Sequence, residues 1–245
     1  MHCHNCLDRI EIPKDAKKIV LVGNPNVGKS VFFNALTGMY VDVSNFPGTT
    51  VDISYGRFGK DVVIDTPGVY GISSFNDEEQ VTRDVVLAAD LVVNIVDAVH
   101  LERDLFLTLQ VIETGIPVIV ALNMIDEAAQ QGVEVDTDLL EHLLGVPVIP
   151  TVAIKGQGID ELKNRIYEAR TGIIPPELQK ELKEMLNRVG TQAEALLVLE
   201  GDPHVAEHHG VPPGARREEL YRSRRNRVND IVGHVARETY RNARF

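Results

Sequence analysis

The residues from Gly23 to Ser30 have the types and spacing of a loop that binds phosphate groups. Gly23, Gly28, Lys29 and Ser30 match the pattern G-x-x-x-x-G-K-[ST]. In such a loop, backbone N–H groups and the N-terminus of the following helix direct positive partial charge toward phosphate oxygens. The lysine reaches the terminal phosphates, and the serine hydroxyl is a Mg²⁺ ligand. The predicted phosphate-binding residues of this loop are Asn24, Pro25, Asn26, Val27, Gly28, Lys29 and Ser30.

Two further segments carry groups that suit the phosphates and Mg²⁺. In Asp65-Thr66-Pro67-Gly68, the acid can hold Mg²⁺ through a water while the Gly68 N–H faces a γ-phosphate. The loop-like segment 45–52 contains Gly48, Thr49 and Thr50, and one threonine hydroxyl is needed there to complete the Mg²⁺ ligands. We assign that role to Thr50 rather than Thr49. The predicted Mg²⁺ ligands are Ser30, Thr50 and Asp65.

A third motif, Asn123-Met124-Ile125-Asp126, has the chemistry to select guanine. A carboxylate accepts hydrogen bonds from the N1–H and 2-amino groups of guanine, which adenine does not offer. Asp126 is therefore the predicted base selector and Asn123 its structural partner, although a helix N-cap before an acidic turn is an alternative. The segment 151–156 is expected to complete the base site, with the Ala153 N–H directed at guanine O6. The predicted guanine-binding residues are Asn123, Met124, Asp126, Val152, Ala153 and Ile154.

The elements between these motifs alternate in pattern from Ile19 to about Gly172. The predicted strands are Ile19–Val22, Val51–Phe58, Val62–Asp65, Leu91–Asp97, Val118–Asn123 and Val148–Thr151. The predicted helices are Ser30–Thr37, Glu78–Ala88, Leu105–Thr114, Asp136–Leu144 and Gly158–Ala169. Such alternation predicts a mostly parallel sheet covered by helices on both faces. Ligands bind beyond the carboxyl ends of such strands, where the three motifs lie.

Pro175-Pro176 ends the alternating pattern, because proline interrupts helices and restricts the residue before it. The apolar residues beyond it recur with helical spacing, interrupted by turns at 201–203 and 211–214. We therefore predict an α/β nucleotide-binding domain over residues 17–172 and a small all-helical subdomain over residues 173–245. Residues 1–16 would form an N-terminal extension.

Composition and charge narrow the range of functions. The chain has 245 residues, 44% of them hydrophobic, which is enough for a globular core. It contains neither a run of about 18 apolar residues nor the apolar segment of a signal peptide, so a soluble, cytoplasmic chain is expected. The net charge is −11, although residues 216–244 hold nine Arg against four acids. The negative net charge makes a nucleic-acid partner unexpected, and the basic end needs a separate explanation.

The two cysteines of the chain, Cys3 and Cys6, form a Cys-x-x-Cys pair flanked by His2 and His4. These are soft ligands at metal spacing, but a structural metal site needs a second ligand pair from elsewhere. The pattern leaves two alternatives open, a partial metal-binding or redox site and a disordered terminus. It provides no disulfide framework.

The sequence in and around these motifs resembles the cytoplasmic G domain of the bacterial ferrous-iron transporter family FeoB. The resemblance covers about residues 17–172 and rests on Phe33–Gly38, Pro47–Asp52, Asn94–Ala98 with Leu101–Leu105, and Ile116–Asp126. Residues 174–245 resemble the family's guanine-nucleotide-dissociation-inhibitor-like (GDI-like) domain in position and size. The resemblance implies a P-loop GTPase that hydrolyses GTP at the cytoplasmic face of the bacterial inner membrane. A membrane transport domain would follow as its partner.

The resemblance also explains the basic end and the catalytic machinery. Arginines close to a membrane span would face anionic lipid, whereas a solvated helix face is the alternative. Gly68 is followed by Val69 and Tyr70, so no glutamine is placed to orient the attacking water. In potassium-activated relatives an asparagine at the position of Asn26 binds K⁺, which implies K⁺ as an activator here. The predicted catalytic residues are Lys29, Thr50, Gly68 and Asn26.

Two observations set limits on this interpretation. Val152 stands where a serine is usual in these GTPases, which removes a hydroxyl near the base and leaves nucleotide affinity open. The alternative function is that of a soluble GTPase of ribosome assembly or RNA modification, because such proteins share the phosphate loop and Asp65–Gly68. They usually carry a basic RNA-binding appendage, and the charge outside residues 216–244 fits that poorly. The sequence does not indicate an oligomeric state.

Overall fold

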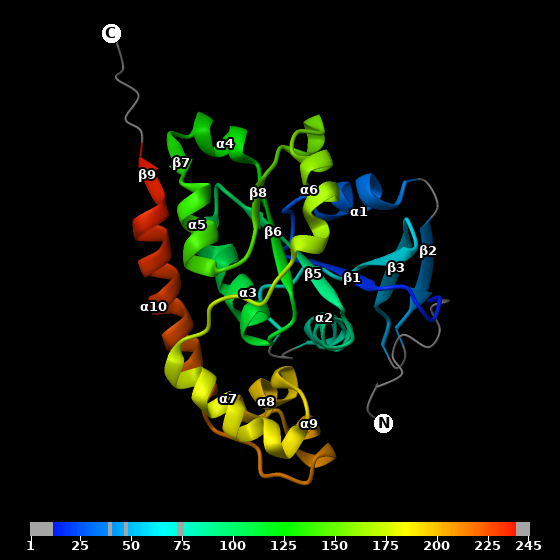
Figure 1. The fold of residues 1–245 in the computed structure, drawn as a ribbon, viewed down its shortest axis with the longest axis vertical. Helices are drawn as coiled ribbons and strands as arrows, with labels where there is room; N and C mark the ends of the chain where they lie inside the picture. The colour runs from blue at the N-terminus through cyan, green and yellow to red at the C-terminus, as the bar shows by residue number, and fades with distance from the viewer. Residues whose placement is uncertain (1–11, 39–40, 47–48, 73–75, 239–245) are drawn as a thin grey trace.

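The computed structural model describes residues 12–38, 41–46, 49–72 and 76–238, and its centre is a seven-stranded sheet with strand order β2-β3-β4-β1-β5-β6-β8 (Figure 1). The strands are β1 Lys18–Gly23, β2 Val41–Asn45, β3 Asp52–Phe58, β4 Asp61–Asp65, β5 Leu91–Asp97, β6 Val118–Asn123 and β8 Val148–Pro150. The β2–β3 and β3–β4 pairs are antiparallel, and all the other neighbours are parallel. This confirms the predicted mostly parallel sheet.

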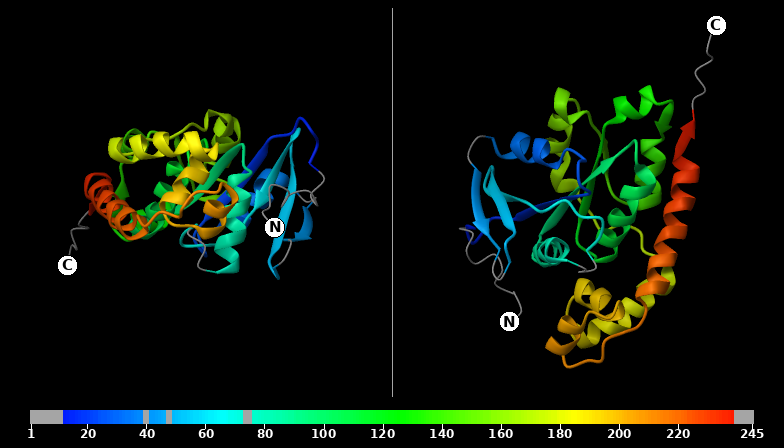
Figure 2. Two further views of the ribbon diagram at one scale, coloured as in Figure 1. Left: turned by 90° about the horizontal axis from the view of Figure 1, so that it is seen from below. Right: turned by 180° about the vertical axis from the view of Figure 1, so that it is seen from behind.

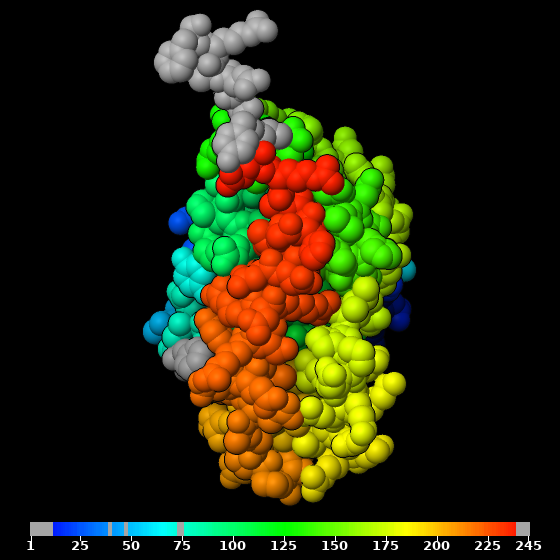
Figure 3. Space-filling model, turned by 90° about the vertical axis from the view of Figure 1, so that its left-hand side faces the viewer, coloured from blue at the N-terminus to red at the C-terminus, as the bar shows by residue number. Residues whose placement is uncertain are grey.

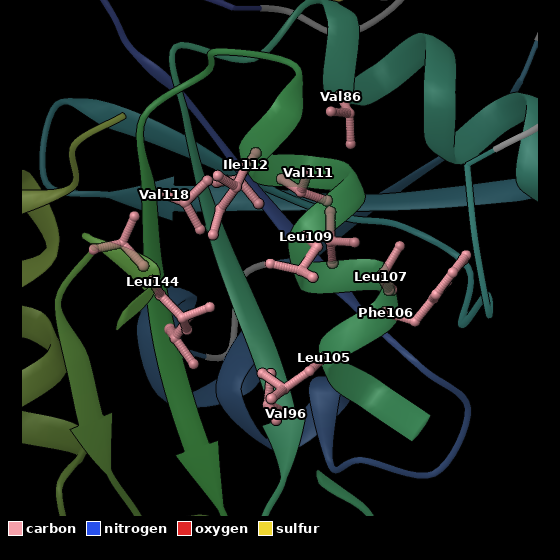
Figure 4. Close-up of a cluster of buried hydrophobic side chains, with 14 of the residues drawn as sticks. Val86, Val96, Leu105, Phe106, Leu107, Leu109, Val111, Ile112, Val118 and Leu144 are labelled. Atoms are coloured by element: carbon pink, nitrogen blue, oxygen red, sulfur yellow. The ribbon is translucent and has the colours of Figure 1, made fainter. Parts of the chain in front are cut away.

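Helices cover both faces of the sheet, and alternate residues of a strand pack against different helices. In β1, Ile19 and Leu21 belong to the core under α1 (Lys29–Thr37) and α6 (Ile159–Arg165). Val20 and Val22 belong to the opposite core, which contains side chains of α2 (Asp77–Leu87), α3 (Leu101–Glu113) and α5 (Thr137–Leu144). Figure 4 shows part of this second core, which contains apolar side chains of α3 together with Val86, Val96 and Leu144. The sheet is thus buried on both faces.

The helical region that follows the sheet has a core of its own. Its helices α7 (Pro176–Val189), α8 (Gln192–Leu199) and α9 (Pro203–His208) pack around Leu182, Leu196 and Val198. Helix α10 (Arg217–Val235) starts in this cluster and then runs back along the sheet domain, as Figures 1 and 2 show.

The far half of α10 is part of the main core rather than of the helical cluster. Val228, Ile231 and Val235 pack there, and Figure 3 shows the helix lying between segments of both regions. Beyond it, β9 (Ala236–Glu238) pairs with β7 (Val133–Val135) in a separate two-stranded sheet. The boundary at residues 172 and 173 stays a prediction.

Several elements were not predicted. Strand β2 (five residues) is an edge strand in which only Val41 and Val43 alternate with polar residues, and both valines are exposed. The short helix α4 (Ile125–Gln130) and the strands β7 and β9 are too short to produce a clear period. Helix α3 begins at Leu101, whereas the predicted start was Leu105. The prediction missed the first turn because that turn is mostly polar. Within the described residues, no helix is both long and apolar enough to cross a membrane.

Candidate functional site

The loop between β1 and α1 is shaped by glycines and one left-handed asparagine. Gly28 has φ 89° and Asn26 has φ 66°, and both values belong to the left-handed region. A Cβ on Gly23 would lie 2.8 Å from the carbonyl oxygen of Ile95, and a Cβ on Gly28 would lie 2.9 Å from Asn123 Nδ2. Neighbouring strands therefore leave no room for side chains at either position. Such a turn directs the first N–H groups of α1 outward, as anion binding requires.

The segment after β4 lies directly beside this loop. Lys29 Nζ is 2.6 Å from Asp65 Oδ1 and also donates to the carbonyl of Thr66. A Cβ on Gly68 would lie 2.9 Å from Pro25 Cα, so only glycine permits this approach. Burial raises the pKa of Asp65, and the nearby Lys29 ammonium opposes that shift. The structure therefore brings together the predicted phosphate loop, Asp65 and Gly68.

Asn123, at the end of β6, joins the phosphate loop to the base loop. Its Nδ2 donates to the carbonyl of Val27 at 3.0 Å. Its Oδ1 accepts from the Ala153 N–H at 3.0 Å and from Thr151 Oγ1 at 3.2 Å. The side chain is 3% exposed, so these contacts are well shielded from water. Because Ala153 N–H already has this acceptor, its predicted contact with guanine O6 stays a prediction.

Asp126 lies in the first turn of α4, after Met124 in a left-handed conformation with φ 61°. Lys155 Nζ lies 2.5 Å from Asp126 Oδ2, and this hydrogen bond lowers the pKa of the carboxyl group. The sequence did not indicate Lys155, because nothing in the spacing of the base-loop residues marks a lysine as the partner of a distant acid. The two residues are 29 positions apart.

The base loop itself places its side chains differently. Val152 is 2% exposed and Ile154 is 74% exposed, so only the second presents its side chain to solvent. Thr151 supplies a hydroxyl one residue before Val152, and it donates to Asn123 rather than to the solvent. The loop therefore retains a hydroxyl that supports Asn123 although the usual serine is replaced.

The remaining predicted residues divide into two groups. Thr50 is exposed, whereas Thr49 Oγ1 donates to the carbonyl of Phe46 at 3.2 Å. Gly48, Cys3 and Cys6 lie outside the described residues. Over the described part of the chain, no group of three or more His, Cys, Asp or Glu side chains is arranged to hold a metal ion. The assignments of Thr50, Gly48 and the two cysteines stay predictions.

The sequence matches the family model described as "Ferrous iron transport protein B" over residues 17–166, which is more than half of the chain. The chain belongs to this family. Curated FeoB-family relatives agree with the match. The Fe(2+) transporter FeoB of Escherichia coli (strain K12) is 37% identical over 248 residues, covering 91% of this chain and 32% of that relative. The chain therefore matches between a fifth and a third of the length of its curated relatives.

Solved structures of FeoB proteins match both regions of the chain. The cytosolic domain of the T. maritima FeoB iron transporter in a GDP form has a TM-score of 0.78 at 31% identity, covering 92% of this chain and 100% of that one. Its GMPPNP form also has a TM-score of 0.78, at 31% identity over 90% of this chain and 99% of the other. The P-loop GTPase fold predicted from the motifs is confirmed by these similarities.

The sequence did not reveal the buried charges that join the two regions of this FeoB-family chain. Arg224 of α10 donates to Glu113 of α3 at 2.6 Å and also to Glu200. Arg83 of α2 donates to Asp202, the N-cap of α9, at 2.6 Å. The one available signal was Glu113, an acid at the end of an apolar helical stretch. Its partner is 111 residues away, and no local pattern identifies it.

Proposed function

We propose that this chain is the GTP-binding and GTP-hydrolysing regulatory part of a membrane ferrous-iron transporter. One observation carries the proposal, namely the position of Asn123, which hydrogen-bonds Val27 of the phosphate loop and Ala153 of the base loop. It thereby brings Asp126 and Lys29 into one site. FeoB cytosolic domains solved in GDP and GMPPNP forms support guanine nucleotide as the ligand.

The residues at the phosphate end fit Mg²⁺. Ser30 and Thr50 offer hydroxyl oxygens and Asp65 a carboxylate, and these hard oxygen donors are the ligands that Mg²⁺ prefers. When bound with the nucleotide, the ion neutralises charge on the β- and γ-phosphates. The chain would orient the phosphates with the N–H groups that open α1, with Lys29 and with the Gly68 N–H. Lys29 would exchange its contact with Asp65 for the phosphates.

Hydrolysis would proceed without a glutamine next to Gly68. Val69 is apolar and only 3% exposed, whereas Tyr70 is 58% exposed to solvent. Neither can orient a water in the way that a glutamine does. A monovalent cation near the β- and γ-phosphates would supply positive charge, and the exposed Asn26 offers a side-chain oxygen for K⁺. The left-handed φ of Asn26 shows that it also serves the turn.

The proposed partners lie at the membrane. The longer FeoB relatives imply a C-terminal transport domain as the first partner. The exposed Arg222 of α10 and Arg237 of β9 would face anionic lipid of the inner leaflet. Binding to anionic vesicles that weakens with salt is the expected result, and sedimentation with vesicles of different charge measures it.

Exchanging Asp126 for Asn tests the nucleotide assignment. In the variant an amide N–H faces the 2-position of the base, so it repels the 2-amino group of guanine and suits the 2-oxo group of xanthine. We expect Asp126→Asn to weaken GTP binding and strengthen XTP binding, with titrations of both nucleotides as the measurement. The control is Asp160→Asn, an exposed acid in the first turn of α6. An unchanged preference for GTP in Asp126→Asn would contradict the assignment.

The cation is tested separately. Turnover of the wild-type chain should be faster in K⁺ than in Na⁺, and Asn26→Ala should abolish that difference while Mg²⁺ is held constant. Equal rates of the wild type in the two salts would rule out Asn26 as a K⁺ ligand and leave the GTPase assignment intact.

A further inference from the structure

Asp104 is a buried carboxylate that accepts a hydrogen bond from Asn24 of the phosphate loop. It lies in the first turn of α3 and is 1% exposed. Its Oδ1 accepts from Asn24 Nδ2 at 2.8 Å and from Arg103 Nε at 2.7 Å, and its Oδ2 accepts from the Asp97 N–H at 2.9 Å. The carboxylate thus joins α3, the end of β5 and the first residue after Gly23.

Asn24 depends on this contact for the orientation of its side chain. The residue is 2% exposed, and its Oδ1 has no hydrogen-bond partner within the described part of the chain. The contact with Asp104 is therefore the one that fixes which way the amide faces, since the reversed amide would place an oxygen against a carboxylate. A hydrogen bond to a charged acceptor in a dry site is stronger than a neutral one.

The surroundings of Asp104 act on its charge in opposite directions. Burial raises the pKa of its carboxyl group, and the hydrogen bonds from Arg103 and the Asp97 N–H oppose that shift. The N-terminus of α3 adds a favourable dipole. His100 and Arg103 also lie against the neighbouring Asp97, at 2.7 Å and 3.7 Å. Arg103 and the Asp97 N–H therefore contact the same carboxylate that accepts from the Asn24 amide.

We propose that Asp104 is a positioning residue for nucleotide binding, which acts by holding Asn24 and with it the backbone of the phosphate loop. The inference rests on the proposed binding of guanine nucleotide. The loop binds phosphate through backbone N–H groups, whose directions are set by the few residues between Gly23 and Lys29. Small displacements of such donors weaken every contact they make, because hydrogen bonds depend steeply on geometry.

The alternative is that Asp104 only stabilises the junction of α3 and β5. Thr108 is a matched residue for that role, because it lies one turn further along α3 and is 0% exposed. Its Oγ1 donates to Asn94 Oδ1 of β5 at 2.6 Å and, within the described part of the chain, makes no hydrogen bond with the phosphate loop. Thr108→Val should therefore lower stability without changing nucleotide affinity, which separates the two roles.

A double-mutant cycle tests the proposal, with a fluorescent GDP analogue as the probe and thermal unfolding as the check on folding. Asp104→Ala in the wild-type background should raise the Kd for the analogue roughly tenfold, the effect of losing one charge-assisted hydrogen bond. In the Asn24→Ala background the same substitution should change the Kd by less than about twofold, since Asp104 then has no residue in the loop to act on.

The outcomes separate clearly. An equal weakening by Asp104→Ala in both backgrounds, or a weakening matched by Thr108→Val, would overturn the proposal in favour of a structural role. If Asp104→Ala does not fold, Asp104→Asn takes its place in the same cycle, because an amide keeps only one of the acceptor oxygens. A wild type that does not bind the analogue would overturn the proposed function as well. If the wild type binds the analogue and both Asp104 variants bind it as tightly as the wild type does, this inference alone is overturned.

Discussion

The nucleotide site and the junction between the two regions both contain ion pairs, but these pairs differ in their exposure to solvent. At the site, Lys155 and Asp126 form an ion pair with 59% and 24% of their side chains exposed. At the junction, Arg224 and Glu113 form one with 3% of each side chain exposed. Exposed charges can exchange their partners for a ligand, whereas buried charges need each other. The first region is thus suited to binding and the second to holding two parts of the chain together.

Removing the central arginine of the junction should have the largest effect. Arg224→Met keeps the length of the side chain but leaves Glu113 and Glu200 buried without a cation. We expect a loss of about 3–5 kcal/mol in the free energy of unfolding, measured by urea denaturation. The control is Arg222→Met on the same helix, whose side chain is 72% exposed in its pair with Glu218. It should cost less than about 0.5 kcal/mol, and equal losses in the two variants would contradict the comparison.

The second contact across the junction should be weaker but still measurable. Asp202 Oδ2 accepts from Arg83, while its Oδ1 caps α9. Asp202→Asn keeps the cap and removes the charge, so a loss of about 1.5–3 kcal/mol in unfolding free energy is expected. Asp136→Asn is the matched control, because Asp136 caps α5 but its ion pair with Arg237 is long, at 3.7 Å, and exposed. A similar loss in both variants would place the effect in the caps rather than in the buried charge.

The cost of losing Arg224 should also depend on pH. Burial raises the pKa of Glu113 from its usual 4.5 even beside Arg224, and without the arginine it rises further. A carboxyl group with a raised pKa binds its proton more tightly in the folded chain, so acid favours the folded variant. The stability gap between wild type and Arg224→Met should therefore narrow by roughly 1 kcal/mol between about pH 7.5 and about pH 5. A gap that widens toward acid would show that Glu113 does not carry the uncompensated charge.

The same contrast explains what the sequence could predict. Gly28, Lys29, Asp65 and Asp126 belong to short local motifs at strand ends, so their places in the fold could be predicted from motif spacing. The parallel sheet could be predicted from the alternation of strand and helix patterns. The junction could not be predicted, because Arg224 belongs to a run of arginines that also fits a solvated helix face. Its burial depends on Glu113, 111 residues earlier. Strand β9 was missed because three residues are too few to show a period and its partner β7 is distant in sequence.

Asp104 was missed for a different reason. It lies in the segment Leu101–Leu105, which the sequence analysis used only as part of the resemblance to the FeoB family. Its contact with Asn24 crosses 80 residues and joins the end of one strand to the helix after another. Parallel strands place such positions side by side at the carboxyl edge of the sheet. An acid in the first turn of a helix, however, is also an ordinary companion of the helix dipole. The local pattern therefore favoured the simpler explanation.

The smallest effect should come from the exposed pair at the nucleotide site. Lys155 Nζ donates to Asp126 Oδ2, one of the two carboxylate oxygens available to the guanine N1–H and 2-amino groups. Lys155 then competes with the base for this carboxylate, and Lys155→Gln removes the competitor while keeping a polar side chain. Because an exposed pair contributes little, GDP affinity should rise by no more than about fivefold, and less at high salt. Titrations of GDP at two salt concentrations measure this.

Lys163→Gln on α6 is the control for the change in net charge. A lower affinity in Lys155→Gln would mean that the lysine contacts the bound nucleotide. In that case Lys155 would be a part of the guanine site rather than its competitor, and the exposed pair would be less exchangeable than its solvent exposure indicates.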